Sequence, residues 1–126
     1  MLLLEGSGHA YILAGAFDDL IARHEALRTG LVERDGIVLQ HVHDKVTFAV
    51  DEHDFSSLME PERRVQVDGL AMRMCQTAFD LAVPPHLRVA LARLSEREHV
   101  LVIVFHHAII DGSSMGAWIA VHAALQ

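Results

Sequence analysis

Residues 100–112 read VLVIVFHHAIIDG. The stretch opens with an unbroken apolar run, which is typical of a strand buried on both faces of a sheet. His106 and His107 stand at the end of this predicted strand, and Asp111 and Gly112 follow where glycine permits a turn. Burying a polar group without a hydrogen bond costs about 2–7 kcal/mol on transfer scales. We therefore expect the functional site at the end of this strand.

The two adjacent histidines are expected to differ in role. Neighbouring side chains of an extended strand point to opposite faces, so only one of His106 and His107 can face a given pocket. An imidazole there can act as a general base near neutral pH, and Asp111 can accept a hydrogen bond or pair with an arginine. Ser113 or Ser114 can begin a helix whose first N–H groups favour developing negative charge. The alternative is structural: two core histidines followed by an ordinary Asp-Gly turn.

Short apolar and alternating segments predict the remaining strands. The pair Asp35-Gly36 is a strong hairpin signal between its two flanking segments. We expect strands at residues 2–5, 31–33, 37–42, 46–50, 87–92 and 99–105. Residues 51–60 are acidic and are expected to form a loop with a helical turn at residues 55–58. Residues 79–85 are expected to form a second loop.

Apolar side chains at helical spacing predict three helices, at residues 9–27, from Pro61 to about residue 78, and from Ser113 or Ser114 to residue 125. Their apolar stripes are Leu13, Phe17, Leu20, Ile21, His24 and Leu27 in the first, Val67, Leu70, Ala71, Met74, Cys75 and Ala78 in the second, and Met115, Trp118, Ile119, His122 and Leu125 in the third. The order of strands and helices predicts an α/β sandwich with a mixed sheet packed by helices.

The composition fits one domain of 126 residues and argues against several classes of protein. A formal net charge of −7 leaves no basic stripe for a nucleic acid. No apolar run approaches the roughly 18 residues of a membrane span. Cys75 is the sole cysteine, which excludes an internal disulfide and fits a cytoplasmic protein; we expect a buried, unreactive thiol. Hydrophobic residues make up 52% of the chain, so we expect apolar surface that contacts another lobe or subunit.

A pair of histidines is the best candidate for binding a metal ion. His41 and His43 lie two residues apart on a predicted strand, so their side chains would face the same side. A zinc site needs further ligands, and the neighbouring sequence offers no obvious third one. We therefore predict that the chain binds no metal.

Three segments resemble one protein family. Residues 105–115, FHHAIIDGSSM, resemble the HHxxxDG motif of condensation domains in nonribosomal peptide synthetases. Residues 23–29, RHEALRT, match the RHExLRT motif that this family carries on its first long helix. Residues 79–81, FDL, followed by residues 85–89, PHLRV, resemble its FDL…P-LR stretch. Chloramphenicol acetyltransferase and other acyltransferases share the looser HHxxxDG pattern, but the RHExLRT segment favours the peptide-synthetase branch.

The resemblance implies a fold. Condensation domains consist of two chloramphenicol acetyltransferase-like lobes, each a two-layer α/β sandwich with a mixed sheet packed by helices, and a tunnel runs between the lobes. Residues 1–126 would be one partial lobe, the N-terminal one. The first motif of the family and the whole second lobe would be missing from this chain.

The resemblance also implies a reaction, in which an acceptor amine attacks a carrier-bound acyl or peptidyl thioester and forms an amide. His107 would position the amine or take its proton, and His106 would mainly pack. Asp111 would pair with an arginine, and Gly112 would leave room for substrate. Arg23 and Arg28 would stabilise the lobe. Both lie in the RHExLRT motif, which also contains His24. No cofactor would bind the chain directly, because the substrates are carried on the phosphopantetheine of carrier proteins.

Other functions stay open. The chain could be a non-catalytic fragment or a module that binds carrier proteins. It could also be an acyltransferase whose active sites lie between identical subunits, and epimerisation domains carry a similar His-His motif. Besides carrier proteins, we expect the second lobe or identical subunits as partners, with self-association through Trp118, Ile119 and the strand at residues 100–105. We expect no nucleic-acid or membrane partner.

Overall fold

The computed structural model describes residues 2–5 and 9–106. The chain divides into two compact units. The first, here called the sheet unit, contains residues 1–12, 49–78 and 88–104. The second, here called the hairpin unit, contains the described residues 13–48, 79–87, 105 and 106. Each unit is described by itself.

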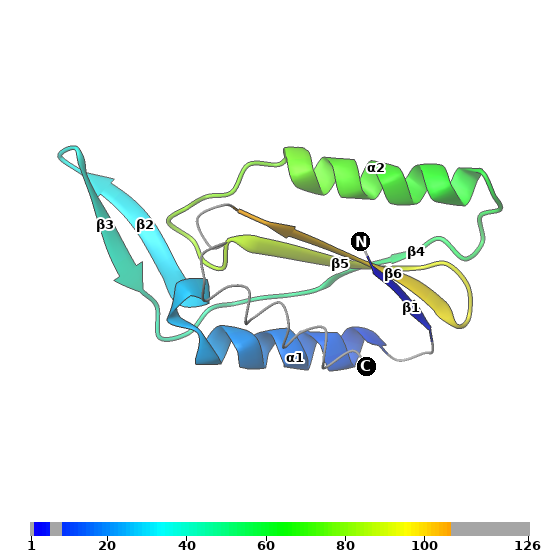
Figure 1. Cartoon of the computed structure of the whole chain (residues 1–126), viewed down its shortest axis with the longest axis horizontal. Helices are drawn as coiled ribbons and strands as arrows, with labels where there is room; N and C mark the ends of the chain where they lie inside the picture. Colours follow the sequence, from blue (N-terminus) through cyan, green and yellow to red (C-terminus); the bar gives the residue numbers. More distant parts are fainter. Residues whose placement is uncertain (1, 6–8, 107–126) are drawn as a thin grey trace. The chain divides into compact units, whose positions relative to one another are not determined.

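The sheet unit is built on a four-stranded sheet with the order β1-β6-β5-β4 (Figure 1). The strands are β1 (Leu2–Glu5), β4 (Asp51–Asp54), β5 (Leu87–Arg93) and β6 (Glu98–Phe105). β1 pairs antiparallel with β6, whereas β4 pairs parallel with β5. The mixed sheet confirms the predicted α/β class, and β1 and β6 lie where the sequence predicted strands.

Helix α2 (Glu62–Gln76) runs along one face of this sheet (Figure 1). Its contact with the sheet contains Val67, Leu70 and Met74 from the helix and Ala90, Ala92, Val100 and Val102 from β5 and β6. The predicted stripe is therefore right at its three largest members. It is wrong for Cys75, which is exposed, because the next residue after Met74 turns about 100° away from the packed face. It is also wrong for Ala78, which lies beyond the helix end and is exposed.

Strand β5 is more deeply buried than its alternating sequence predicts. Val89 and Leu91 are buried on one face, and Ala90 and Ala92 are fully buried on the other. Two neighbouring strands cover its edges, so both faces of a central strand are available for packing. Alanine suits the face that α2 covers, because a small side chain lets a helix approach closely.

Strand β4 lies where a loop was expected, and the predicted strand at residues 46–50 is absent from the structure. β4 pairs through its backbone with β5, from Asp51 opposite Ala90 to Asp54 opposite Arg93. Its side chains are mostly exposed, so the polar sequence DEHD is compatible with an edge strand. The hydroxyl and the backbone N–H of Ser56 both donate to Asp54 Oδ1, at 2.5 and 2.9 Å, and hold the pKa of Asp54 below its usual value.

The central position of β6 bears on self-association. β6 lies between β1 and β5, and Val100, Leu101 and Val102 are buried. These three residues therefore cannot form the exposed contact surface that the sequence suggested. The predicted helix at residues 113–125, with Trp118 and Ile119, lies outside the described residues.

The hairpin unit contains most of helix α1 (His9–Arg23), the short 3₁₀ helix η1 (Glu25–Arg28) and the hairpin of β2 (Thr29–Arg34) and β3 (Ile37–Val42). The apolar stripe of α1 is confirmed, since Leu13, Phe17, Leu20 and Ile21 are buried. The predicted single helix to residue 27 is wrong, because the chain becomes extended at His24, with φ −119° and ψ 111°, and resumes as η1.

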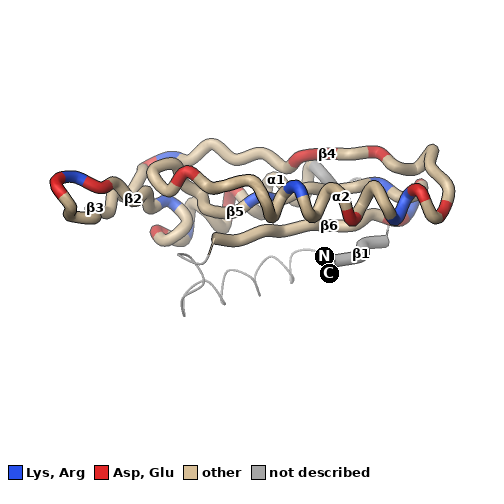
Figure 2. The backbone as a smooth tube through the Cα atoms, turned by 90° about the horizontal axis from the view of Figure 1, so that it is seen from above, with Lys and Arg blue, Asp and Glu red and all other residues tan. Residues whose placement is uncertain are grey.

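The predicted hairpin is confirmed, and β2 extends further than residues 31–33. Asp35 and Gly36 both have positive φ, 52° and 79°, as a tight two-residue turn between twisted strands requires. Charged residues gather at this tip (Figure 2). Ile37, Val38 and Leu39 of β3 are exposed.

In the described part of the chain, no helix combines the length and the apolar character that crossing a bilayer requires.

Arg88 donates hydrogen bonds to the C-terminal end of α2, and its replacement measures how much these bonds contribute to the free energy of unfolding. Its Nη1 donates to Met74 O at 3.1 Å and to Thr77 O, and its Nη2 donates to Ala78 O at 2.6 Å. These carbonyls lie in or just after the last turn of α2, where intrahelical donors run out. We expect Arg88→Met to lower the free energy of unfolding by about 2 kcal/mol, since hydrogen bonds from a charged donor are lost.

Urea unfolding of wild type and of Arg88→Met measures this change in the free energy of unfolding. Arg64→Met is the matched control, because Arg64 lies on α2 itself and pairs only at the surface with Asp68, at 3.3 Å. That substitution should leave the unfolding midpoint nearly unchanged. Equal losses in Arg88→Met and Arg64→Met would contradict a specific role of Arg88 at the helix end.

Candidate functional site

His106 is the only residue of the predicted catalytic set that the structure describes. His107, Asp111 and Gly112 lie outside the described residues, as do Ser113 and Ser114. His106 follows β6 directly and is half-buried. The geometry of the candidate site is therefore built around His106 and the residues of the hairpin unit that contact it.

His106 is held through its backbone and its ring. Its N–H donates to His86 O at 2.9 Å. Its ring meets the ring of Phe79 nearly edge-on, with centroids 5.8 Å apart and planes at 80°. The ring of His86 approaches it at 6.1 Å and 68°. Two aromatic neighbours and one backbone hydrogen bond thus restrict the residue that precedes His107.

His86 is almost completely buried, with 2% of its surface exposed. Its Nε2 lies 2.8 Å from Leu81 O. A backbone carbonyl only accepts hydrogen bonds, so this nitrogen carries the proton and donates. His86 was not among the site residues predicted from the sequence. The available signal was a polar residue between Pro85 and Leu87, at the entry to an apolar strand.

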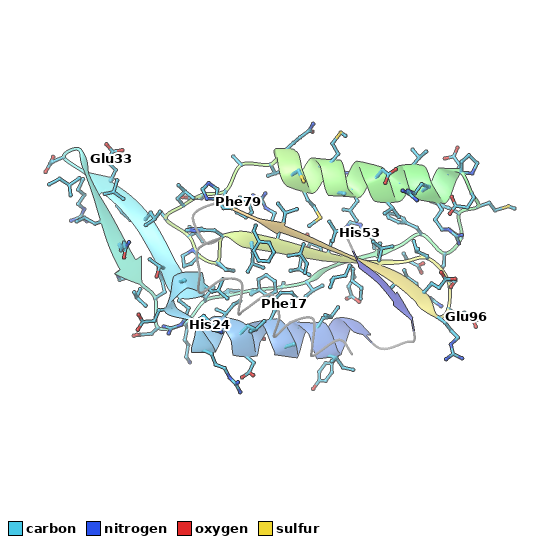
Figure 3. The ribbon with its side chains drawn as sticks, in the orientation of Figure 1. Phe17, His24, Glu33, His53, Phe79 and Glu96 are labelled. Carbon is cyan, nitrogen blue, oxygen red and sulfur yellow. The ribbon has the colours of Figure 1, made fainter. Side chains whose placement is uncertain are left out.

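The loop of residues 79–85 connects His86 with strand β2. Leu81 O accepts from both His86 Nε2, at 2.8 Å, and Leu31 N, at 2.7 Å. Asp80 supports the bend, because its Oδ1 accepts from Ala82 N at 3.1 Å and its backbone O accepts from Val83 N at 3.0 Å. Phe79 stands at the start of this loop (Figure 3). A single carbonyl group therefore joins the strand after the RHEALRT segment to the histidine that contacts His106.

Gly30 permits the close approach of this loop to β2. A Cβ added at Gly30 would lie 2.4 Å from Ala82 O and 3.1 Å from Ala82 C. Both atoms belong to the backbone, so they cannot move aside as the end of a flexible side chain could. Gly30 was not a predicted site residue, and no local pattern distinguishes it from an ordinary strand glycine.

Arg28 and Arg23, both from the RHEALRT segment, have different surroundings. Arg28 Nε donates to Ile21 O at 3.0 Å and its Nη1 donates to His43 O at 2.9 Å, while its own backbone O accepts from His43 N at 2.8 Å. It thereby ties the end of α1 to the segment after β3. Arg23 is exposed and forms a surface ion pair with Asp19 at 3.2 Å. Such pairs contribute about 0–1 kcal/mol.

His24 lies between α1 and η1, where Figure 3 labels it. Its N–H donates to Leu20 O at 3.1 Å, and its carbonyl accepts from Leu27 N at 3.0 Å. Its backbone therefore closes the last turn of α1 and the first turn of η1. These described contacts of His24 are backbone hydrogen bonds that link α1 to η1, which is a structural role.

We expect Arg28→Met to lower the free energy of unfolding by about 2 kcal/mol, because two carbonyls lose a charged donor while most of the side-chain volume is kept. Urea unfolding measures the loss. Arg23→Met, in the same segment but at the surface, is the control and should change the midpoint little. A larger loss in Arg23→Met than in Arg28→Met would contradict the assignment of the stabilising role to Arg28.

His41 and His43 lie near each other, with ring centroids 4.6 Å apart. Within residues 2–5 and 9–106, the structure contains no group of three or more His, Cys, Asp or Glu side chains placed to hold a metal ion. A groove of about 440 Å³ on the hairpin is lined by both histidines together with Val32, Leu39 and Ala82. His106 is not among the residues that line this groove.

Known proteins resemble this chain in sequence and in structure. Chondramide synthase cmdD of Chondromyces crocatus is 37% identical over 123 residues, which cover 97% of this chain and 3% of that synthase. The crystal structure of SgcC5 from Streptomyces globisporus matches with a TM-score of 0.82 and 27% identity, over 98% of this chain and 28% of SgcC5. The X-domain from teicoplanin biosynthesis, solved in complex with OxyB, matches with a TM-score of 0.77 and 29% identity, over 98% of this chain and 26% of that one.

The chain thus spans a small part of the relatives that it matches. The profile of the family described as "Condensation domain" matches residues 1–121, nearly the whole chain. That range includes the RHEALRT segment, the FDL loop and the His-His segment. Within the hairpin unit, the FDL loop contacts Leu31 of β2, and His86, which contacts that loop, contacts His106. The match confirms the chloramphenicol acetyltransferase-like α/β fold that the resemblance implied. The chain belongs to the condensation-domain family of nonribosomal peptide synthetases.

Proposed function

We propose that residues 1–126 supply part of the N-terminal lobe of a condensation domain that forms amide bonds. The donor is an acyl or peptidyl thioester on a carrier protein, and the acceptor is an amine. One observation carries the proposal most directly: Leu81 O accepts from both Leu31 N and His86 Nε2, while His86 O accepts from His106 N. These hydrogen bonds join the FDL…P-LR stretch to His106 and to β2, the strand that begins at the last residue of the RHEALRT segment.

The proposed reaction is an acyl transfer. The amine nitrogen attacks the thioester carbonyl carbon, the new C–N bond forms, and the C–S bond breaks. His107 positions the amine or accepts its proton, which leaves on the departing thiol. Asp111 holds the turn by pairing with an arginine, Gly112 leaves room for substrate, and His106 packs against Phe79 and His86. No step requires a metal ion or a cofactor held by this chain.

The proposed partners follow from this reaction. Both substrates are presented on the phosphopantetheine arms of carrier proteins, which enter a tunnel from opposite ends. A second lobe, or an identical subunit in its place, completes the tunnel. Positioning two reactants in this way can contribute about 7–11 kcal/mol to lowering a barrier, so a single lobe would lose most of the rate.

A reconstitution experiment tests the proposal. The chain is mixed with one carrier protein loaded with an acyl thioester and another loaded with an aminoacyl thioester, with and without the second lobe. Intact-protein mass spectrometry follows the acceptor carrier. We expect its mass to increase by the acyl group only when the second lobe is present. An unchanged acceptor mass with both lobes present would contradict the proposed activity.

A second candidate function is a non-catalytic binding module. The similarity to the teicoplanin X-domain favours it, because that domain was solved in complex with another protein, OxyB. Under this hypothesis a loaded carrier protein binds the reconstituted two-lobe protein, and no acyl group is transferred. Titration of the carrier by calorimetry, alongside the mass measurement, separates binding from turnover.

A further inference from the structure

We propose that His86 is a positioning residue for the catalytic histidine. This inference rests on the proposed function, because it assigns to His86 the placement of the segment that leads to His107. The structural basis is a chain of contacts from β2 through the loop of residues 79–85 to His106. His86 is the member that joins the loop to His106.

The His86 side chain provides the connection to the loop. It is 2% exposed and donates from Nε2 to Leu81 O at 2.8 Å. Leu81 O also accepts from Leu31 N at 2.7 Å, so the carbonyl receives two donors from opposite directions in sequence. Leu81 is half-buried, and without the His86 donor its carbonyl keeps only the bond from Leu31 N, so the loop gains freedom to shift.

The His86 backbone and ring provide the connection to the site. Its carbonyl accepts from His106 N at 2.9 Å, and its ring lies 6.1 Å from the ring of His106. The ring centroid of Phe79, at the other end of the same loop, lies 5.8 Å from that of His106. A shift of the loop would therefore change both aromatic neighbours of His106 together. His106 is the residue that precedes His107 in the sequence, so such a shift changes the placement of the immediate neighbour of the proposed catalytic histidine.

This arrangement makes a prediction that depends on the position of one N–H group. A glutamine at position 86 carries an amide nitrogen at about the reach of Nε2 and can donate to Leu81 O. An asparagine carries the same amide on a side chain one methylene shorter and cannot reach it. Both variants bury an amide, so the difference in kcat between them reports on the hydrogen bond to Leu81 O.

The experiment compares wild type, His86→Gln and His86→Asn in the reconstituted two-lobe protein. Amide formation is measured at varied acceptor concentration by mass spectrometry. Because small misplacements near a reacting group can cost up to about a hundredfold in rate, we expect His86→Asn to lower kcat by about tenfold or more. KM for the acceptor should change by less than about twofold, and His86→Gln should keep kcat within about threefold of wild type.

Two further measurements separate positioning from general loss of stability. His99→Asn places the same amide in another buried position, on β6, and should leave kcat within about twofold of wild type for the fraction of protein that is folded. Hydrogen exchange of the His106 amide is measured in each variant without substrates. We expect exchange at least about tenfold faster in His86→Asn than in His86→Gln.

The outcomes distinguish this inference from the function on which it rests. Wild-type protein that forms no amide overturns the proposed function. Wild-type turnover with equal kcat in His86→Gln and His86→Asn overturns the inference alone, as does equal exchange of the His106 amide in the two variants. A loss of kcat in His99→Asn as large as that in His86→Asn also overturns it, because the effect is then one of stability.

Discussion

His107→Ala is expected to abolish nearly all amide formation by the two-lobe protein, with a fall in kcat of about a hundredfold or more, since general acid–base catalysis contributes about 10²–10⁴-fold. The reason is chemical: the substitution removes the imidazole that is proposed to orient the amine or accept its proton. The rate is measured as the mass increase of the acceptor carrier at saturating donor and acceptor.

Carrier binding is the first control for this prediction. Docking depends on the protein surface rather than on the imidazole, so the affinity of His107→Ala for a loaded carrier protein should equal that of wild type. The matched histidine substitution is His41→Ala, because His41 is exposed on β3. His41→Ala should keep the wild-type rate. If His107→Ala retained a third of the wild-type rate, the proposed role of His107 would be wrong.

Local chemistry made several parts of the fold predictable from the sequence. The Asp35-Gly36 pair predicted the hairpin because its backbone angles are accessible to few other dipeptides, and both residues indeed have positive φ. The spacing of Val67, Leu70 and Met74 predicted the packed face of α2 because a helix places these residues on one side. Each of these signals is contained in a few neighbouring residues.

The parts that were wrong depend on pairing and packing that local hydrophobicity does not show. β4 has the polar sequence of a loop and becomes a strand because β5 supplies backbone partners. Cys75 follows the buried Met74 in the sequence, yet it is exposed. Local hydrophobicity does not show where the edge of a packed face falls.

The candidate site divides along the same line. The HHxxxDG motif identified His106 as a candidate site residue, and the RHExLRT motif identified Arg28 as a stabilising residue. His86 and Gly30 were missed, because each is recognised only by its contact with one backbone carbonyl: Leu81 O, five positions from His86, and Ala82 O, 52 positions from Gly30. Hydrogen bonding to a particular carbonyl leaves no pattern in a single sequence.

Gly30→Ala is expected to have the largest effect on stability, a loss of about 3 kcal/mol in the free energy of unfolding, at the upper end of what overpacking costs. The added Cβ would lie 2.4 Å from Ala82 O. Ala82 cannot withdraw freely, because Asp80 Oδ1 holds its N–H at 3.1 Å and the neighbouring Leu81 O is bonded to Leu31 N at 2.7 Å. Urea unfolding of the variant, followed by circular dichroism, measures the loss.

Gly15→Ala is the matched control, since it makes the same chemical change in the same unit. A Cβ at Gly15 would meet nothing within 4 Å, and the residue lies inside α1. Alanine has a higher helix propensity than glycine, so this substitution should raise the free energy of unfolding by about 1 kcal/mol. The two variants should therefore change stability in opposite directions. A Gly30→Ala protein as stable as wild type would mean that the loop of residues 79–85 does not approach β2 as the structure describes, and the contacts from Leu31 to His106 would then lack their basis.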